Sequence, residues 1–351
     1  MKTPPLDDER NIEFEFVRAT ENAALNSIHW MGRGDKEAAD AAACDAIYGV
    51  FDLVDICGEV VIGEGIKDNA PGIFLGDKLG TWKEGSPNFD IALDPIDGTS
   101  NIAKGLPNSI SVMSAAVVPD HRKRCMVNIQ SFYVEKIAYG PQVADAIRKN
   151  DLAPIRLDVP FHRSLVVAAT ALKKRISDLV VVVLDRPRNQ TYIDTVRAEG
   201  ASLRLISDGD IAAAVAPSLH DSGVDLYAGI GGAPEGILTA SALKTLGGEI
   251  QLRIWPRDDA ERAELLKTHS PSDIERVHYT DDLVAGDSAI FCATGISDSA
   301  LLPGVKLVGN TAITHSILMR ARSKTVRYIR AVHNLSAKTI HLRSSAGEKG
   351  I

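Results

Sequence analysis

The stretch Asp94-Pro-Ile-Asp-Gly-Thr-Ser-Asn101 follows directly on the apolar run Ile91-Ala-Leu93. A short apolar run bounded by turn residues is typical of a buried strand. Because proline cannot continue a strand ladder, we expect this strand to end at Asp94. Gly98 and Thr99 then indicate the start of another element, most simply a helix. The stretch therefore predicts a strand, a tight turn and a helix in succession.

This turn places two carboxylates, Asp94 and Asp97, close together. Such carboxylates repel each other, and one holds a proton unless a cation neutralises the pair. A hard divalent ion with oxygen ligands is the natural cation, and Mg²⁺ prefers sites that it shares with substrate phosphates. The backbone N–H groups after Gly98 can meet a phosphate, and the Thr99 hydroxyl can orient a water or a phosphoryl oxygen. A surface turn would explain the Asp, Pro and Gly content, but not the apolar strand before it.

The composition is that of an enzyme-sized globular chain. The 351 residues, 45% hydrophobic and 24% charged, suggest one large or two fused domains. A formal net charge of −7 argues against a general nucleic-acid binder. No apolar run approaches membrane-spanning length, and the N-terminal residues contain no apolar signal region. We expect a cytoplasmic protein whose cysteines are reduced thiols, because no C-x-x-C spacing occurs among Cys44, Cys57, Cys125 and Cys292.

The first half of the chain predicts two helices followed by short strands. Apolar residues at helical spacing predict a helix from about Ile12 to Met31, which Gly32-Arg-Gly34 ends. Asp35 is a suitable N-cap for a second helix, which runs to about Val54 and carries Asp40 in its first turns. Strands are expected at 60–62, 109–118 and 134–139, with Glu64 between two glycines just after the first of them.

Strands and helices alternate in the second half. Strands are expected at 179–184, 203–206, 224–228 and 249–254, and helices at about 210–216 and 235–246. This alternation, with buried-looking strands, implies an α/β fold whose parallel or mixed sheet is covered on both faces. The highly charged stretch 257–279 is expected to be a solvated excursion.

Further polar residues lie at or near the ends of apolar elements, where ligands gather in such sheets. Asp40 and Glu64 add carboxylates to the pair at residues 94 and 97. The loop Gly229–Gly236 opens a helix and can bind an anion, although it fits neither a P-loop nor a dinucleotide fingerprint. Glu235 in this loop either binds a metal or substrate, or stabilises the helix start by its charge. The remaining candidates are Asp208-Gly-Asp210, which suits sugar hydroxyls or a helix cap, and Arg188, which suits a phosphate.

Six motifs in one order resemble the class II fructose-1,6-bisphosphatases, a branch of the lithium-sensitive, metal-dependent sugar and inositol phosphatases. The resemblance extends from about Ile12 to His333 and implies a layered α/β/α/β/α sandwich. It also implies hydrolysis of the 1-phosphate of fructose 1,6-bisphosphate, in gluconeogenesis or related sugar-phosphate metabolism. The motifs are Gly32-Arg-Gly-Asp-Lys36 with Asp40, Val61-Ile-Gly-Glu-Gly65, Asp94–Thr99, Tyr133-Val-Glu-Lys136, Asp208-Gly-Asp210 and Gly229–Gly236.

The resemblance implies a role for each matching residue. The ligands of Mg²⁺ or Mn²⁺ would be Asp40, Glu64, Asp94, Asp97 and Glu235. Thr99 would supply the catalytic hydroxyl, with Lys36 and Asp68 near it. Substrate contacts would come from Asp97, Gly98, Thr99, Tyr133, Arg188, Asn189, Asp208, Gly209, Asp210 and Gly232. Two positions depart from the pattern: some relatives carry glutamate at the position of Asp97, and relatives often carry histidine at that of Asn189, which leaves one substrate hydrogen bond open.

Three alternative functions stay open at this point. They are a dual fructose and sedoheptulose bisphosphatase, an inositol-monophosphatase-like sugar phosphatase, and a non-catalytic sugar-phosphate sensor. The intact carboxylate set and Thr99 argue against the sensor. We expect residues 1–155 to form a metal-binding subdomain with the catalytic motif, and residues 156–351 an α/β substrate-binding subdomain. The expected partners are a small sugar bisphosphate and further copies of the chain in a dimer or tetramer, with no nucleic acid or membrane.

Overall fold

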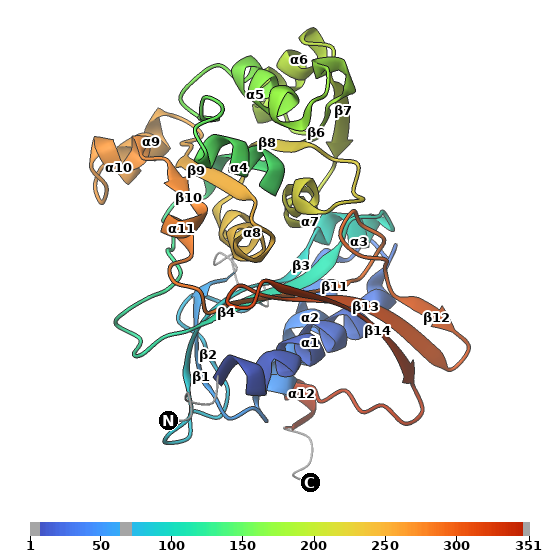
Figure 1. Cartoon of the computed structure of the whole chain (residues 1–351). Coiled ribbons are helices and arrows are strands. Elements are labelled where there is room, and N and C mark those ends of the chain that lie inside the picture. The colour runs from blue at the N-terminus through green and yellow to red at the C-terminus, as the bar shows by residue number, and fades with distance from the viewer. Residues whose placement is uncertain (1–7, 64–71, 347–351) are drawn as a thin grey trace, which may run out of the picture. The chain divides into compact units, whose positions relative to one another are not determined.

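A computed structural model describes residues 8–63 and 72–346. The chain divides into two compact units, which we describe separately (Figure 1). Unit 1 comprises Met1–Val127 and Ala285–Ile351, and unit 2 comprises Asn128–Val284. Each unit has a mixed sheet covered by helices, which confirms the expected α/β class. In the described ranges, every helix is too short or too polar to cross a lipid bilayer.

The units divide the chain differently from the boundary expected near residue 155. The last part of the chain returns to unit 1, because β11 (Ala289–Gly295) pairs along its whole length with β4 (Ile110–Val117). The first crossing between units lies at residue 127 and the second at residue 284. The alternation of strands and helices along the sequence does not show which distant strands pair. Residues after 284 were therefore expected in the substrate-binding subdomain, residues 156–351.

Unit 1 is built on an eight-stranded sheet with the order β12-β13-β11-β4-β3-β1-β2, and β14 lies beside β13. Among its described strand pairs, β1 and β3 run parallel and the others run antiparallel. The strands not yet bounded are β1 (Cys57–Ile62), β2 (Lys78–Leu79), β3 (Asn88–Asp97), β12 (Lys306–Val308), β13 (Thr311–Arg320) and β14 (Thr325–Asn334).

Two helices, α1 (Asp8–Ser27) and α2 (Lys36–Phe51), cover one face of this sheet (Figure 1). Phe89, Ile91 and Leu93 alternate along β3 and join both helices in one apolar core. Both helices were expected; α1 ends at Ser27 and the 3₁₀ turn η1 (Ile28–Trp30) continues it. The predicted cap is confirmed, since the Asp35 carboxylate accepts a hydrogen bond from the Ala38 N–H at 2.9 Å. Two short helices complete unit 1, α3 (Thr99–Lys104) and α12 (Arg343–Ala346).

Unit 2 is built on a six-stranded mixed sheet with the order β10-β9-β5-β8-β6-β7. Strand β6 runs parallel to its neighbours β7 and β8, whereas β5 runs antiparallel to β8 and β9. This matches the expected parallel or mixed sheet. The strands are β5 (Tyr133–Tyr139), β6 (Val180–Leu184), β7 (Ser202–Ile206), β8 (Leu226–Gly232), β9 (Glu249–Ile254) and β10 (His278–Tyr279).

Helices pack on both faces of the unit 2 sheet. On one face, α4 (Pro141–Arg148), α5 (His162–Leu172) and α6 (Gln190–Ala198) share an apolar core with Ile137, Val181 and Leu226. The alternate residues of the strands face α7 (Asp210–Val215) and α8 (Ala233–Leu246), which contact β5 and β8. The remaining elements are η2 (Ile176–Asp178), η3 (Pro187–Asn189), η4 (Ala216–Ser218), α9 (Asp259–Leu265), α10 (Pro271–Glu275) and α11 (Thr280–Leu283).

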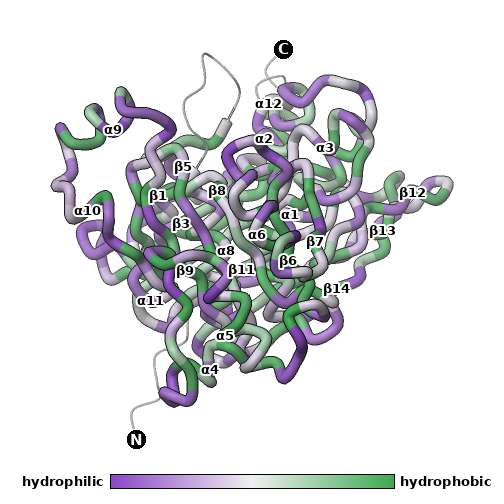
Figure 2. The backbone as a smooth tube through the Cα atoms, turned by 90° about the horizontal axis from the view of Figure 1, so that it is seen from above, coloured by the Kyte–Doolittle hydropathy of each residue, from purple (hydrophilic) through white to green (hydrophobic). Residues whose placement is uncertain are grey.

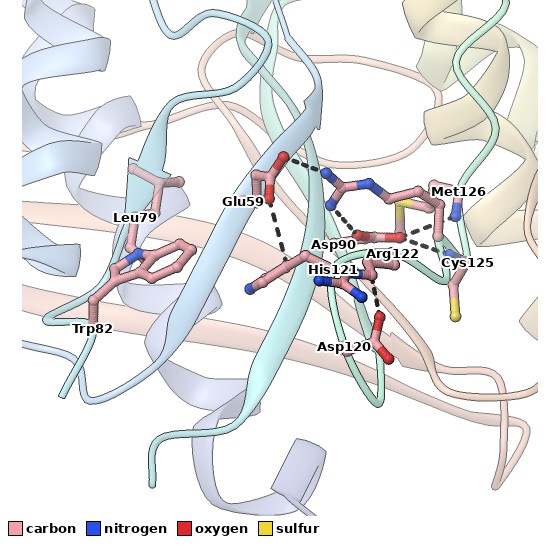
Figure 3. Close-up of polar contacts among 10 residues, drawn as sticks. Glu59, Leu79, Trp82, Asp90, Asp120, His121, Arg122, Cys125 and Met126 are labelled. Carbon is pink, nitrogen blue, oxygen red and sulfur yellow. Dashed lines mark hydrogen bonds and ion pairs between the residues drawn. The ribbon is translucent and has the colours of Figure 1, made fainter. Parts of the chain in front are cut away.

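The charged stretch 257–279 contains α9 and α10 and is largely exposed. Hydrophilic residues occupy much of this stretch (Figure 2). Asp258 and Ser270 cap the two helices, since their side chains accept hydrogen bonds from the Glu261 and Asp273 N–H groups. The stretch is thus the solvated excursion that its composition predicted, with local capping that holds its short helices.

Candidate phosphatase site

The motif Asp94–Asn101 begins within β3, and the strand does not end where expected. β3 continues through Pro95 to Asp97. Pro95 falls in an irregularity of the ladder, because Asp94 pairs with Val112 whereas Asp97 pairs with Ile110. A proline is tolerated at a bulge, where no ladder hydrogen bond is required of it. The predicted end of the strand at Asp94 was therefore wrong.

The two carboxylates of this motif differ in their surroundings. The Asp94 side chain is half-buried and accepts a hydrogen bond from the Ile96 N–H at 3.0 Å. Asp97 is only 4% exposed. Asp94 also lies on the opposite face of β3 from Leu93, which belongs to the core beneath α1 and α2. Asp94 thus faces away from that apolar core, as a ligand-binding carboxylate must.

Gly98 makes the turn from β3 into α3 possible. Its φ is +93°, and a Cβ at this position would lie 2.5 Å from the Asn108 carbonyl oxygen. The Gly98 carbonyl accepts hydrogen bonds from the Asn101 N–H at 2.9 Å and the Ser109 hydroxyl at 2.9 Å. Thr99 is the first residue of α3 and is half-buried. Gly98, not Thr99, occupies the cap position, so the Thr99 hydroxyl has no capping role in this helix.

The other unit 1 candidates lie near this turn in the fold or outside the described residues. Asp40 is half-buried on α2, and α2 packs against α3, the helix that Thr99 begins. Lys36 begins α2 and is exposed. Glu64 and Asp68 lie outside the described residues.

Unit 2 contains a second polar cluster, on the face of its sheet that α7 and α8 cover. The Lys136 ammonium lies 2.8 Å from Asp210 Oδ2, and these side chains are 1% and 5% exposed. The Tyr227 hydroxyl donates to the same carboxylate oxygen at 2.7 Å. A Cβ on Gly231 would lie 2.3 Å from Asp210 Oδ2, so glycine alone fits there. Asp210, expected either to bind sugar or to cap α7, is the first residue of α7 after a Gly209 cap and is held by this pair.

Glu235 stands in the first turn of α8, beside the Lys136–Asp210 pair. Its Oε2 atom is buried and has no hydrogen-bond partner among the described residues. Burial raises the pKa of this carboxyl, and Asp210 raises it further, whereas Lys136 acts in the opposite direction. A Cβ on Gly232 would lie 2.0 Å from the same Oε2 atom, so glycine at 232 leaves room for the carboxylate. A buried carboxylate oxygen without a donor suits a cation.

Arg188 and Tyr133 form a stacked pair at the end of two strands. The Arg188 guanidinium carbon lies 4.2 Å from the centre of the Tyr133 ring, and Arg188 Nε donates to the Ile230 carbonyl at 3.1 Å. Asp208 is half-buried, with an oxygen 4.0 Å from the Arg186 guanidinium. Arg188 is therefore held by its Nε and its flat face, which leaves the terminal nitrogens as the fork that suits a phosphate.

Asn189 has a supporting position beneath this pair. The side chain is fully buried. Its amide nitrogen donates to the Leu184 carbonyl at 3.0 Å, and its amide oxygen accepts from the Ile230 N–H at 2.6 Å. Both ends of the amide thus bind backbone, and the substrate contact expected of Asn189 stays a prediction.

Two residues of this cluster were not predicted: Lys136 stands in the motif Tyr133–Lys136 without an expected role, and Tyr227 lies outside every motif. A usable signal existed for Lys136. It lies among the alternating residues of Tyr133–Tyr139, at a position that the β-strand pattern assigns to a buried face. A lysine buried in a strand is almost always paired, and this predicts a carboxylate near it. No comparable signal marks Tyr227, which reads as an ordinary strand aromatic.

The oxygen donors at these positions fit a hard divalent cation such as Mg²⁺ or Mn²⁺. In unit 1, Asp94 and Asp97 lie at one strand end. In unit 2, taken by itself, Glu235 has a buried oxygen that no donor among the described residues reaches. Among residues 8–63 and 72–346, no three His, Cys, Asp or Glu side chains are grouped so that they could hold a metal. Glu64, which the sequence predicts as a ligand, lies outside these ranges.

Comparison with known proteins identifies the family. Residues 10–333 match the family described as bacterial fructose-1,6-bisphosphatase, glpX-encoded. The class 2 fructose-1,6-bisphosphatase of Haemophilus influenzae is 39% identical over 337 residues, which cover 93% of this chain and 97% of that protein. Fructose-1,6-bisphosphatase 1 class 2 of Escherichia coli K12 is 36% identical over 340 residues, which cover 94% of this chain and 97% of that protein. The resemblance seen in the motifs is thereby confirmed, and the chain belongs to the family of glpX-encoded bacterial fructose-1,6-bisphosphatases.

Proposed function

We propose that this chain is a phosphoric monoester hydrolase that removes the 1-phosphate of fructose 1,6-bisphosphate, releasing fructose 6-phosphate and phosphate. The family match and the names of the two relatives support this activity. The structural observation that carries it is the turn at the end of β3. There Asp94, Asp97 and Thr99 follow one another around a left-handed glycine.

The family consists of metal-dependent phosphatases, and we propose Mg²⁺ or Mn²⁺ as the ion. Asp40, Glu64, Asp94, Asp97 and Glu235 would hold it. When bound, such an ion neutralises phosphate charge and acidifies a water. The carboxylates that are not yet neutralised would otherwise repel the substrate, so phosphate binding and metal binding depend on each other.

The residues after Asp97 would position the reacting groups. The half-buried Thr99 side chain is at the start of α3, where its hydroxyl would align the attacking water or a phosphoryl oxygen. Backbone N–H groups that follow Gly98 would meet the phosphate. Lys36 and Asp68 would complete the surroundings of the hydrolysed phosphate.

Unit 2 would supply the binding site for the rest of the sugar bisphosphate. Arg188, stacked on Tyr133, offers its guanidinium fork to the second phosphate. Asp208, Gly209 and Asp210 would bind sugar hydroxyls, with Asp210 held in place by Lys136. Gly232 would contribute by leaving space beside Glu235.

Three further features belong to the same proposal. We propose a role in gluconeogenesis, which fits the direction of this hydrolysis, and a cytoplasmic location, which fits the free thiols of all four cysteines. We also propose a homo-oligomer, a dimer or a tetramer. β14 is a ten-residue edge strand that pairs with β13 in the described sheet, and Val308 and Val332 nearby are 64% and 59% exposed.

A substrate panel tests the proposed function. Phosphate release would be measured with fructose 1,6-bisphosphate, sedoheptulose 1,7-bisphosphate, inositol monophosphate and glycerol phosphate, each with and without Mn²⁺ or Mg²⁺. We expect the highest kcat/KM with fructose 1,6-bisphosphate. Equal efficiency with inositol monophosphate would instead assign the chain to the broader sugar phosphatases, and binding of the bisphosphate without turnover would indicate a sensor.

A further inference from the structure

Unit 1 contains a cavity of about 440 Å³ between α1, the end of α2 and the segment that follows β14. Its volume lies within the range of small-molecule sites. Ile12, Val50 and Leu53 form an apolar part of its wall, and Arg18, Asn22 and Lys338 form a polar part. We refer to it as the α1 cavity.

The α1 cavity is separate from the proposed phosphatase site. Its wall includes residues of α1 and α2, the helices that cover the face of β3 to which Phe89, Ile91 and Leu93 point. Asp94 alternates to the opposite face of the same strand. The sheet of unit 1 therefore stands between this carboxylate and the cavity, and none of the proposed phosphatase residues lines the cavity.

One side chain in the wall lacks the hydrogen bond that its burial requires. Asn22 is 7% exposed, and its Oδ1 atom is buried without a hydrogen-bond partner among the described residues. A buried amide oxygen without a partner is costly. A flip of the amide by half a turn exchanges its oxygen and its nitrogen, so this position can present either an acceptor or a donor.

The cavity wall carries two neighbouring cations. Burial lowers the pKa of the Lys338 ammonium, the charge of the buried Glu21 raises it, and Arg18 lowers it. The residues that the structure describes include no ion pair to Lys338. The acidic wall residues are already engaged: Glu15 pairs with Arg18, and Asp55 lies 2.8 Å from the Lys83 ammonium. Arg18 is 60% exposed and pairs with Glu15 through one terminal nitrogen, so the rest of its guanidinium can still meet an anion beside Lys338.

We propose that the α1 cavity is a second binding site, which takes a small organic anion with an apolar body. The anionic group is held by Lys338 and Arg18, with the Asn22 amide as an additional partner. The apolar body lies against Ile12, Val50 and Leu53. A phosphate or a carboxylate on a planar or aliphatic body satisfies this chemistry, whereas an inorganic ion leaves the apolar wall uncovered.

The test uses the fluorescent probe anilinonaphthalene sulfonate, which joins an anion to an aromatic body. Titration of the full chain is expected to show saturable binding at one site. Lys338→Gln and Arg18→Gln should each raise the Kd roughly tenfold, the effect of one lost charge-assisted contact. Lys306→Gln, which removes an exposed lysine of β12 in the same unit, serves as the matched control and should leave the Kd unchanged.

Two further variants make the result decisive. Leu53→Trp narrows the cavity while both cations stay; because Leu53 is 65% exposed, this variant should fold even if Lys338→Gln does not. It should weaken probe binding as well. Asp94→Asn alters the proposed phosphatase site and should leave probe binding intact.

Three results would overturn the proposal. The first is an unchanged Kd in Lys338→Gln, Arg18→Gln and Leu53→Trp. The second is loss of binding in Asp94→Asn, which would place the probe in the phosphatase site. The third is equal affinity for phenylnaphthylamine, the same aromatic body without the sulfonate, which would show that the cavity does not select an anion.

Discussion

Lys136 and Asp210 form an ion pair inside unit 2, with 2.8 Å between Nζ and Oδ2 and with both side chains almost fully buried. The desolvation of two charges offsets much of their attraction, so such a pair adds little net stability over apolar residues. What it supplies here is orientation. Asp210 stands at the start of α7, held by Lys136 and by the Tyr227 hydroxyl, in a space that Gly231 leaves open.

Removing one partner of this pair should be strongly destabilising. Lys136→Met leaves the buried Asp210 carboxylate without its cation, although the Tyr227 hydroxyl still donates to it. We expect a loss of about 3–5 kcal/mol in the free energy of unfolding. Urea denaturation measures it. Arg175→Gln breaks the exposed pair with Asp178 and is the control, with no measurable loss expected. Equal stability of the two variants would show that the buried pair is already neutral or hydrated.

Thr99→Ala tests the proposed alignment of the nucleophile. The substitution removes one hydroxyl and little volume, and the cap of α3 is Gly98, so folding should be preserved. We expect kcat to fall by on the order of 10²-fold with a smaller change in KM. Thr99→Ser keeps the oxygen and should retain more activity. If Thr99→Ala matched the wild type in kcat, or lost activity only together with thermal stability, the alignment role would be rejected.

Arg188→Ala tests the binding of the second phosphate. The guanidinium fork should contact ground and transition states alike, so the loss should be mainly in KM for fructose 1,6-bisphosphate, about 2–3 kcal/mol in kcat/KM. Hydrolysis of p-nitrophenyl phosphate, which has no second phosphate, is the control reaction and should hardly change. A parallel loss with both substrates would mean that Arg188 supports the fold of the site rather than the distal phosphate.

Cysteine labelling tests the packing of unit 1 independently of catalysis. Cys292 is buried, and burial raises the pKa of its thiol to about 12, so almost no thiolate forms near neutral pH. Cys44 is also buried, whereas Cys57 and Cys125 are partly exposed. A thiol reagent such as dithionitrobenzoate should label Cys57 and Cys125 in the native protein, and the other two only in denaturant. Rapid native labelling of Cys292 would contradict the described core.

Part of the fold could be predicted because its causes are local. The Asp35 cap of α2, the apolar alternation in β3 and the strand-to-helix rhythm of unit 2 each depend on neighbouring residues, and the structure contains them. The end of β3 was missed because a bulge depends on the partner strand. Pro95 is accommodated where the pairing of β3 with β4 shifts between Asp94 and Asp97. The return of β11 to unit 1 was missed for the same reason, since pairing over such a separation is not written in either strand alone.

The candidate site also contains features that neighbouring residues predict and features that only the fold creates. The residues Asp94, Asp97, Gly98 and Thr99 could be predicted as one group because they lie close together in the sequence, and the geometry of Gly98 matches the tight turn expected of them. The backbone contacts of Asn189 could not be predicted, because only the fold brings Leu184 and Ile230 to its amide. In the same way, Lys136 acquires a role only when α7 brings Asp210 to it.

The central claim is metal-dependent hydrolysis of the 1-phosphate of fructose 1,6-bisphosphate, and a coupled assay of fructose 6-phosphate tests it most directly. Chelator-treated protein would be assayed for fructose 6-phosphate and for phosphate, before and after addition of Mn²⁺ or Mg²⁺. We predict no activity in the metal-free protein, and equimolar release of both products once the metal is restored. Full activity without metal, or phosphate released without fructose 6-phosphate, would contradict the account.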